Sequence, residues 1–136
     1  MKKSLFISSI VILGTLFLVS CKKDQGLLPV IKFKSTALYV SHDTTLAAGS
    51  DFSIGIDASK AESADVLTQF NITKSVNGAA STTEFTKALT GTEGDSYSYD
   101  YFGTLENNSG QVNKYTFYVT NRDGLTNQVS VSITIQ

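Results

Sequence analysis

The stretch KYTFYVTNRDGLTNQVSVSITI, residues 114–135, carries the clearest structural pattern in the chain. Its second half alternates apolar with polar residues, a period of two that is typical of a strand with one face on the core. The apolar positions, which we expect to face inward, are Val129, Val131, Ile133 and Ile135. The aromatic first half favours a second strand. Residues 121–125 between them include Gly124, which suits a turn that needs a positive φ. The stretch therefore predicts an antiparallel hairpin.

Segments further upstream repeat this pattern. Residues 51–58 (DFSIGIDA) alternate strictly, and residues 67–76 and 82–89 flank Asn77-Gly78, the strongest short hairpin signal in the chain. For residues 82–89 the inward face is either Phe85, Lys87 and Leu89 or Glu84, Thr86 and Ala88. Residues 96–102 add another alternating strand, and residues 30–33 and 37–40 predict a first strand with a break.

These segments give about seven short strands, with turns roughly ten residues apart and no long helical period. We expect an all-β fold, an immunoglobulin-like antiparallel β-sandwich with Greek-key connections, over residues 30–136. A small closed barrel is the alternative. The Cys and Trp core of antibody-type domains is absent, because the chain has one Cys and no Trp.

The N-terminus has the pattern of an export signal. Lys2 and Lys3 precede an apolar run of about 15 residues, which is shorter than the roughly 20 needed for a membrane-spanning helix. The run ends in Leu18-Val19-Ser20-Cys21, which resembles the lipobox of bacterial lipoproteins. That resemblance implies a diacylglycerol on the Cys21 sulfur, cleavage before Cys21 and acylation of the new N-terminus. Several acyl chains on one residue would anchor the protein durably to a membrane.

The expected organisation has three parts: a lipoprotein signal peptide over residues 1–20, a lipid-anchored tether over residues 21–29, and the sandwich domain. The tether is polar at first and ends at Pro29, the only proline in the chain. Lys22 follows Cys21 where an acidic residue would retain a lipoprotein in the inner membrane, so the resemblance implies the outer membrane. Its periplasmic and surface faces both stay open.

Composition limits the partners of the mature chain. Residues 21–136 carry nine basic and twelve acidic side chains, a net charge of −3, which argues against nucleic acid as a partner. A single Cys allows no disulfide within the chain. The remaining 116 residues are enough for a domain that is stabilised by its own core.

Catalytic and metal-binding patterns are weak. His42 is the only histidine and lies beside Asp43, but no nucleophile motif accompanies the pair, so we expect a surface turn. A zinc site needs several His, Cys or carboxylate ligands, so one histidine and a cysteine expected to carry lipid argue against zinc. Loop carboxylates could in principle bind calcium, although the EF-hand loop pattern is absent; they are Asp57, Glu62, Asp65 and Asp123. We expect no enzyme activity, metal or cofactor.

Three tyrosines, Tyr97, Tyr99 and Tyr101, share one face of the strand over residues 96–102. Facing solvent, they would form a platform for sugars or for a protein partner; facing inward, they would be core. The opposite face carries polar Ser98 and Asp100, which favours the core interpretation. Phe102 breaks the alternation and predicts a bulge or the end of the strand.

Two resemblances complete the sequence evidence. Asp43-Thr44-Thr45 resembles the short O-glycosylation acceptor of exported Bacteroidota proteins, which makes Thr44 a candidate modification site. The closing hairpin, residues 51–58 and the lipobox together resemble small lipoproteins of Bacteroidota-type cell envelopes with an immunoglobulin-like or PKD-like domain. Fold resemblance alone implies no particular function.

Three functional hypotheses follow from the sequence. The first is a non-catalytic binding or adhesion module for a glycan or an envelope protein. The second is an accessory subunit of an envelope complex that pairs a neighbour's strand with an exposed sheet edge. The third, which the sequence supports least, is a small hydrolase. An exposed aromatic cluster would favour the first, an uncovered edge strand the second, and a converging acidic cleft the third.

Overall fold

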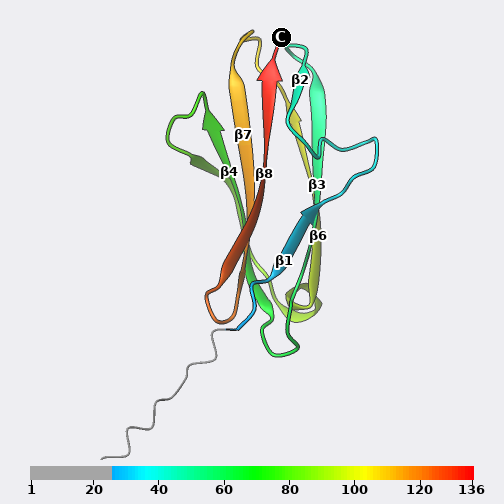
Figure 1. Ribbon diagram of the computed structural model, residues 1–136, viewed down its shortest axis with the longest axis vertical. Coiled ribbons are helices and arrows are strands. Elements are labelled where there is room, and N and C mark those ends of the chain that lie inside the picture. Colours follow the sequence, from blue (N-terminus) through cyan, green and yellow to red (C-terminus); the bar gives the residue numbers. More distant parts are fainter. Residues whose placement is uncertain (1–25) are drawn as a thin grey trace, which may run out of the picture.

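The computed structural model describes residues 26–136, so the predicted signal peptide and Cys21 lie outside the described residues. Eight strands and one short 3-10 turn follow one another along the chain (Figure 1). They are β1 (Val30–Phe33), β2 (Thr44–Leu46), β3 (Asp51–Ser59), β4 (Leu67–Val76), β5 (Thr82–Ala88), η1 (Gly91–Gly94), β6 (Ser96–Thr104), β7 (Val112–Asn121) and β8 (Thr126–Ile135).

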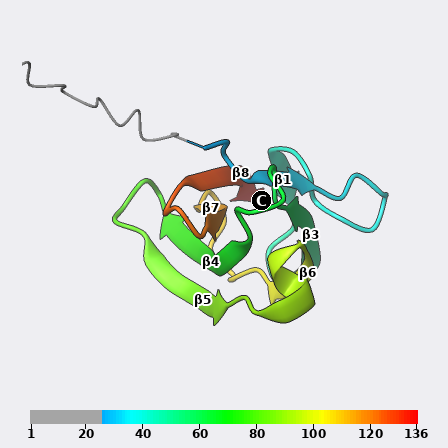
Figure 2. The same ribbon diagram turned by 90° about the horizontal axis from the view of Figure 1, so that it is seen from below.

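The strands form two sheets that pack face to face. One sheet has the order β1-β3-β6 and the other the order β2-β8-β7-β4-β5, and Figure 2 shows the two layers from below. The chain leaves the β4–β5 hairpin for the opposite sheet and returns as β7, which pairs with β4. The predicted all-β immunoglobulin-like sandwich with Greek-key connections is confirmed. The closed barrel is excluded, because each sheet ends in edge strands.

The start of the domain differs from the prediction. Residues 30–33 form β1 as expected, but residues 37–40 form a turn in which the Tyr39 N–H donates to the Thr36 carbonyl at 3.0 Å. The chain then changes sheet, and β2 pairs with β8 in parallel, with Thr44 opposite Ile133. This pair is the exception to an otherwise antiparallel sandwich. The local pattern gave no sign of it, because β2 is only three residues long.

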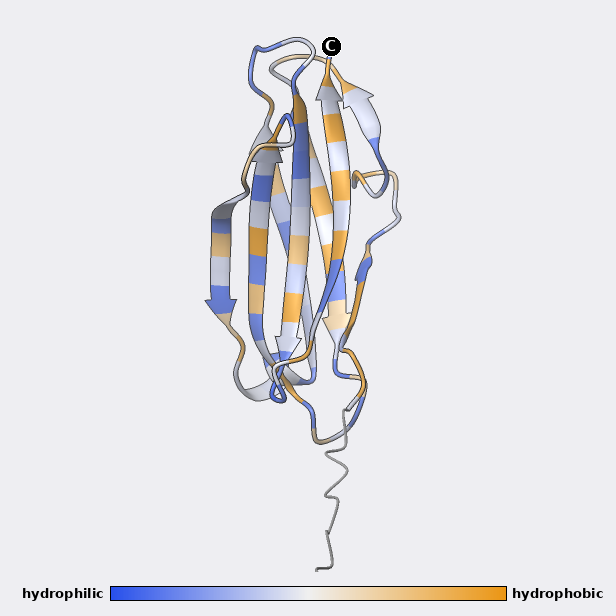
Figure 3. Ribbon diagram, turned by 60° about the vertical axis from the view of Figure 1, so that its left-hand side comes forward, coloured by the Kyte–Doolittle hydropathy of each residue, from blue (hydrophilic) through white to orange (hydrophobic). Residues whose placement is uncertain are grey.

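The closing hairpin forms as predicted. β7 and β8 pair without a register shift from Val112–Thr134 to Thr120–Thr126. Gly124 has a φ of +80°, and the Asn121 side chain accepts a hydrogen bond from the Leu125 N–H at 2.9 Å, which closes the turn. Figure 3 shows the alternation of apolar and polar residues along the strands. The apolar side of β8 lies on the core, with Val131, Ile133 and Ile135 buried and Val129 half-buried.

The tyrosine stripe is part of the core. Tyr97 is buried, and Tyr99 and Tyr101 are half-buried against the same cluster. The ring of Tyr97 lies 5.2 Å from that of Phe70, and the ring of Tyr99 stacks on that of Phe85 at 4.9 Å. Burial also raises the pKa of Tyr101 to about 12. The core interpretation is confirmed, and the stripe offers no platform to solvent.

The hairpin between β4 and β5 settles the open register. Asn77 and Gly78 have φ values of +51° and +75°, as the turn requires. Phe85 and Lys87 are half-buried and Leu89 is buried, so this set faces inward. The pairing shifts between Ile72 and Thr73 at a β-bulge.

The domain also takes up the last residues of the predicted tether. Asn127 donates a hydrogen bond to the Pro29 carbonyl at 2.8 Å, and the Leu27 N–H donates to Glu62 at 3.2 Å. Pro29 is buried. Contacts with the sandwich therefore begin a few residues before the predicted boundary at residue 30. Residues 26–136 contain no helix that is long and apolar enough to span a membrane.

Candidate interaction surface

The sequence-predicted polar residues do not gather into a reactive site. His42 is exposed in a bend, and Asp43 instead accepts a hydrogen bond from the Ser132 N–H at 2.8 Å, which ties the start of β2 to β8. Thr44, the candidate glycosylation residue, is half-buried at the start of β2. His42 and Asp43 therefore lie in a surface turn, as expected.

The loop carboxylates lie mainly at the end of the sandwich where residue 26 enters. Glu62, Asp65 and Asp123 line one shallow hollow beside Gly26, and Asp65 pairs with Arg122 at 3.6 Å. Asp57 lies on β3, in the three-stranded sheet, and does not line this hollow. Across residues 26–136, no three His, Cys, Asp or Glu side chains are grouped closely enough to hold a metal ion.

The two most exposed large apolar side chains lie on the outer face of the three-stranded sheet. Leu38 is 80% exposed and Phe102 is 73% exposed, more than any other large apolar residue of the described chain. Phe102 lies opposite Ser53 on β3, and the Ser53 hydroxyl donates a hydrogen bond to the Leu38 carbonyl. The next most exposed apolar residues, Leu27 and Leu28, belong to the segment that enters the domain at the opposite end (Figure 1).

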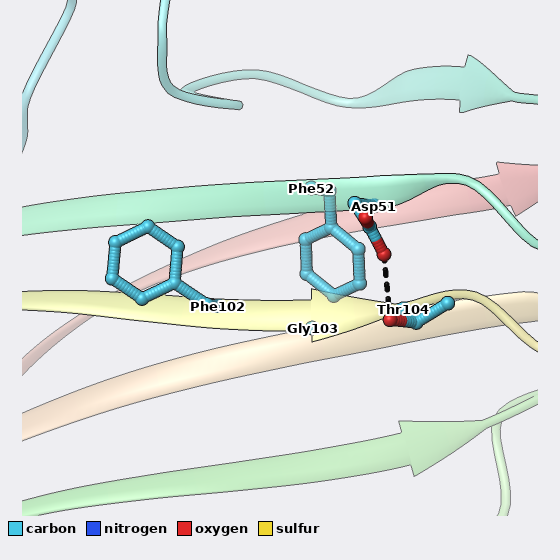
Figure 4. A pocket seen from close by; sticks show the side chains of 5 residues that line it. All are labelled: Asp51, Phe52, Phe102, Gly103 and Thr104. Carbon is cyan, nitrogen blue, oxygen red and sulfur yellow. Dashed lines mark hydrogen bonds between the residues drawn. The ribbon is translucent and has the colours of Figure 1, made fainter.

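Two shallow hollows adjoin Leu38 and Phe102. Both are lined by Asp51, Phe52 and Phe102; one adds Gly103 and Thr104, and the other adds Leu38 and Ser53. We call these seven residues the Leu38–Phe102 patch. Figure 4 shows the first hollow, with the Phe102 and Phe52 rings separate and the Thr104 hydroxyl bonded to Asp51.

Gly103 leaves space for the Phe52 ring at the end of β6. A Cβ atom at Gly103 would lie 2.6 Å from Cζ of Phe52, its cross-strand neighbour, so any side chain there would displace the ring. The Phe52 ring is 7% exposed and packs on Tyr115 at 5.3 Å between ring centres. Glycine at position 103 thus lets a core ring pass close to the β6 backbone.

A polar cluster secures the loop that carries Leu38. Lys34 pairs with Asp100 at 2.5 Å, and the Tyr39 hydroxyl donates a hydrogen bond to the other oxygen of Asp100 at 3.0 Å. The hydrogen bond from Lys34 lowers the pKa of Asp100, and the hydrogen bond to Asp100 raises the pKa of Lys34. Gly55 leaves room for this cluster, because a Cβ there would lie 2.7 Å from Cδ of Lys34.

Strand β6 is an edge of its sheet, and its register with β3 shows which of its backbone N–H and C=O groups point away from β3. The Leu105 N–H donates to the Ser50 carbonyl, and the Lys60 N–H donates to the Asp95 carbonyl, at the two ends of the β3–β6 pairing. Hydrogen-bonded pairs alternate in antiparallel sheets, so the odd-numbered residues of β6 bond to β3. The even-numbered residues, including Ser98, Asp100 and Phe102, direct their backbone groups away from β3.

The predicted bulge or strand end at Phe102 is wrong. β6 continues to Thr104 with no register shift, so Phe102 stays in phase with Ser98 and Asp100 and faces outward. The interrupted alternation was a real signal, but it marked an apolar residue on the solvent side of the sheet. Leu38 gave no comparable signal, because it lay within a predicted strand.

Comparison with known proteins supports the fold and goes no further. No protein-family model matches the chain, and no curated protein matches its sequence. A superoxide reductase (neelaredoxin) from Ignicoccus hospitalis is similar in structure, with a TM-score of 0.53, 9% identity and 81% of each chain covered. The sporulation control protein Spo0M from Bacillus subtilis gives a TM-score of 0.48 at 9% identity, covering 80% of this chain and 49% of that one. The likeness to the superoxide reductase indicates a shared β-rich architecture alone.

Proposed function

We propose that this protein is a non-catalytic, lipid-anchored module of the bacterial cell envelope that binds a protein partner through the Leu38–Phe102 patch. The observation that carries the proposal is the pairing of the two most exposed large apolar residues of residues 26–136 on one sheet face. Single exposed apolar residues are normal on soluble domains, whereas contiguous exposed apolar surface rimmed by polar residues marks interaction sites. The polar cluster of Lys34, Tyr39 and Asp100 holds this surface in place before any partner arrives.

A protein partner fits this surface better than a glycan. Sugar recognition uses exposed aromatic rings, and Phe102 is the single exposed aromatic residue within residues 26–136. The tyrosines that could have formed a platform are packed inside. Leu38 and Phe102 are an aliphatic and an aromatic residue with polar residues around them. Such an arrangement is typical of the centre of a protein interface.

The anchor part of the proposal rests on the sequence. Leu18-Val19-Ser20-Cys21 after an apolar run supports lipidation of Cys21, and Lys22 supports the outer membrane. A role as an accessory subunit of an envelope complex is the second candidate, and the edge of β6, which pairs with no other strand within residues 26–136, favours it. A hydrolase has no comparable support, since His42 is exposed and Asp43 is engaged with β8.

Membrane fractionation tests the anchor. We expect the unaltered protein in the outer-membrane fraction and Cys21→Ala in the soluble or inner-membrane fraction. If Cys21→Ala stays in the outer membrane as firmly as the unaltered protein, the lipid anchor is refuted. Protease treatment of intact cells, compared with lysed cells, then decides between the periplasmic and surface faces.

Amine-reactive cross-linking of isolated envelopes tests the binding surface. We expect discrete higher-mass adducts that disappear in the double variant Leu38→Ser/Phe102→Ser. Leu28→Ser is the matched control, because Leu28 is also more than half exposed but lies outside the patch. Equal loss of adducts in both variants, or no loss in either, would remove the support for this surface.

A further inference from the structure

The sandwich has four edge strands, and three of them are protected against pairing. Strands β1 and β2 are four and three residues long, too short to template a long pairing. Strand β5 carries the β-bulge opposite Ile72 and Thr73, and its Lys87 points inward and pairs with Glu93. Short strands, bulges and inward-pointing charges are the devices by which proteins prevent edge-to-edge association.

Strand β6 lacks all of these devices. It is nine residues long, pairs with β3 in one unbroken register, and contains neither lysine nor proline. Its one charged residue, Asp100, is paired with Lys34. Tyrosine and phenylalanine give it a high strand propensity. An edge of this kind is a template for another strand, and along it lie the backbone groups of Ser98, Asp100 and Phe102, which point away from β3 and have no backbone partner among residues 26–136.

The unprotected edge and the Leu38–Phe102 patch coincide. The even-numbered residues of β6 direct their backbone groups to the free edge and their side chains to the outer face. A strand added at this edge would therefore place alternate side chains beside Phe102 and the adjoining hollows. Main-chain hydrogen bonds would supply affinity along the edge, and the patch would select the side chains.

We propose that β6 accepts an extended segment of a partner protein as an added strand, with an apolar side chain of the segment beside Phe102 and a lysine or arginine beside Asp51. This proposal rests on the proposed binding function and specifies its mode. Asp51 lines both hollows and is exposed, and its carboxylate accepts a hydrogen bond from the Thr104 hydroxyl at 2.7 Å. No ion pair involves Asp51 within residues 26–136, which leaves its charge for a basic partner residue.

The same charges disfavour a second copy of the chain as the added strand. Antiparallel pairing of two β6 strands about Phe102 would place Asp100 of one copy opposite Thr104 of the other. Asp100 is already paired with Lys34, so the second copy would bring no unpaired cation to Asp51, which is bonded to Thr104. A separate segment that is both basic and apolar would supply that cation.

The probe is a phage-displayed library of random ten-residue peptides, selected on the full chain purified in detergent. We expect enriched peptides in which apolar residues alternate with other residues and at least one lysine or arginine is present. On adding a synthetic copy of the best peptide, the amide hydrogens of Ser98, Asp100 and Phe102 should become protected from exchange, as measured by NMR. A library that yields no peptide dependent on these amides overturns the proposal.

Ser98→Pro tests the backbone contact directly. Residue 98 directs its N–H to the free edge, so proline removes a donor to the peptide without removing a bond to β3. We expect affinity for the selected peptide to fall by about ten-fold or more, equivalent to about 1.4 kcal/mol. Ser98→Ala keeps the N–H and should bind like the unaltered chain. Thermal unfolding verifies that both variants are folded, and the exchange measurement on the unaltered chain decides the matter if Ser98→Pro is not.

The outcomes separate the binding mode from the proposed function. If Phe102→Ser abolishes binding while folded Ser98→Pro binds normally, the patch binds its partner but strand addition is refuted. If neither variant affects binding, both proposals fail. If the peptide-free chain is a dimer with these three amides already protected, the added strand is a second copy, and the separate segment is refuted.

Discussion

Truncating two phenylalanines, Phe70 and Phe102, should have opposite consequences. Phe70 is fully buried, and its ring lies 5.2 Å from that of Tyr97, 5.5 Å from that of Tyr99 and 6.4 Å from that of Phe117. Phe102 lies on the outer face and is 73% exposed. Phe70→Ala should destabilise the fold without altering the patch. Phe102→Ala should leave the fold nearly unchanged and remove the centre of the patch.

The magnitudes follow from the buried areas. A fully buried phenylalanine removes about 200 Å² from water, which at about 25 cal/mol per Å² gives about 5 kcal/mol. Measured costs of Phe→Ala in protein cores are about 3–5 kcal/mol, so we expect that range for Phe70→Ala. Only a little over a quarter of the Phe102 surface is buried, and alanine retains part of it. We therefore expect about 1 kcal/mol or less for Phe102→Ala.

Urea unfolding measures both values. The chain has no tryptophan, so tyrosine fluorescence and circular dichroism follow the transition. The free energies of unfolding should differ between the two variants by about 2 kcal/mol or more. If Phe102→Ala costs as much as Phe70→Ala, then Phe102 contributes to the core, and the assignment of its face to binding is refuted. Equal, small costs would instead contradict the packing of the aromatic core.

Three further predictions concern the groups around the patch and the core. Lys34→Met should raise the pKa of Asp100 toward its ordinary value, because the hydrogen bond from Lys34 lowers that pKa in the folded chain. The variant should therefore be less stable than the unaltered chain above about pH 4, and the difference should vanish as the pH falls below that value. Urea unfolding at several pH values measures this difference. The unaltered chain should lose stability between about pH 10 and pH 12, because Tyr101, whose pKa is raised to about 12 in the fold, holds its proton more tightly in the folded than in the unfolded state. Tyr101→Phe should remove that part of the loss. An unchanged dependence of stability on pH would contradict the raised pKa of Tyr101. Gly103→Ala should cost about 1–3 kcal/mol, because its Cβ would meet the Phe52 ring at 2.6 Å, and unfolding that matches the unaltered chain would mean that the ring moves without cost.

Much of the sandwich could be predicted because its strands are half-buried, and half-burial leaves a period of two in the sequence. The β7–β8 hairpin, β3 and the tyrosine stripe all show that period, and the structure places them as expected. Gly124 and Asn77-Gly78 fixed two turns, since few residues adopt a positive φ. Register was predictable only where one face was plainly apolar.

The patch could not be predicted from local patterns. Leu38 and Phe102 lie far apart in the chain and become neighbours only because β3 and β6 pair and the turn after β1 folds over β3. Residues 37–40 are rich in apolar residues and were therefore predicted as part of a strand. They form a turn instead, after which the chain passes to the five-stranded sheet as β2. Phe102 carried a visible signal, but only the unbroken β6 register shows that its side chain faces solvent.

Site-specific photo-cross-linking in intact cells tests the central claim most directly. A photoreactive phenylalanine derivative is placed at position 102 and, as the control, at position 130, an exposed position on β8 in the other sheet. If the Leu38–Phe102 patch binds a protein partner, irradiation should give a discrete protein adduct from position 102 and none from position 130. Adducts of equal yield from both positions, or none from position 102 while the chain is folded and in the membrane fraction, would contradict a binding role for this surface.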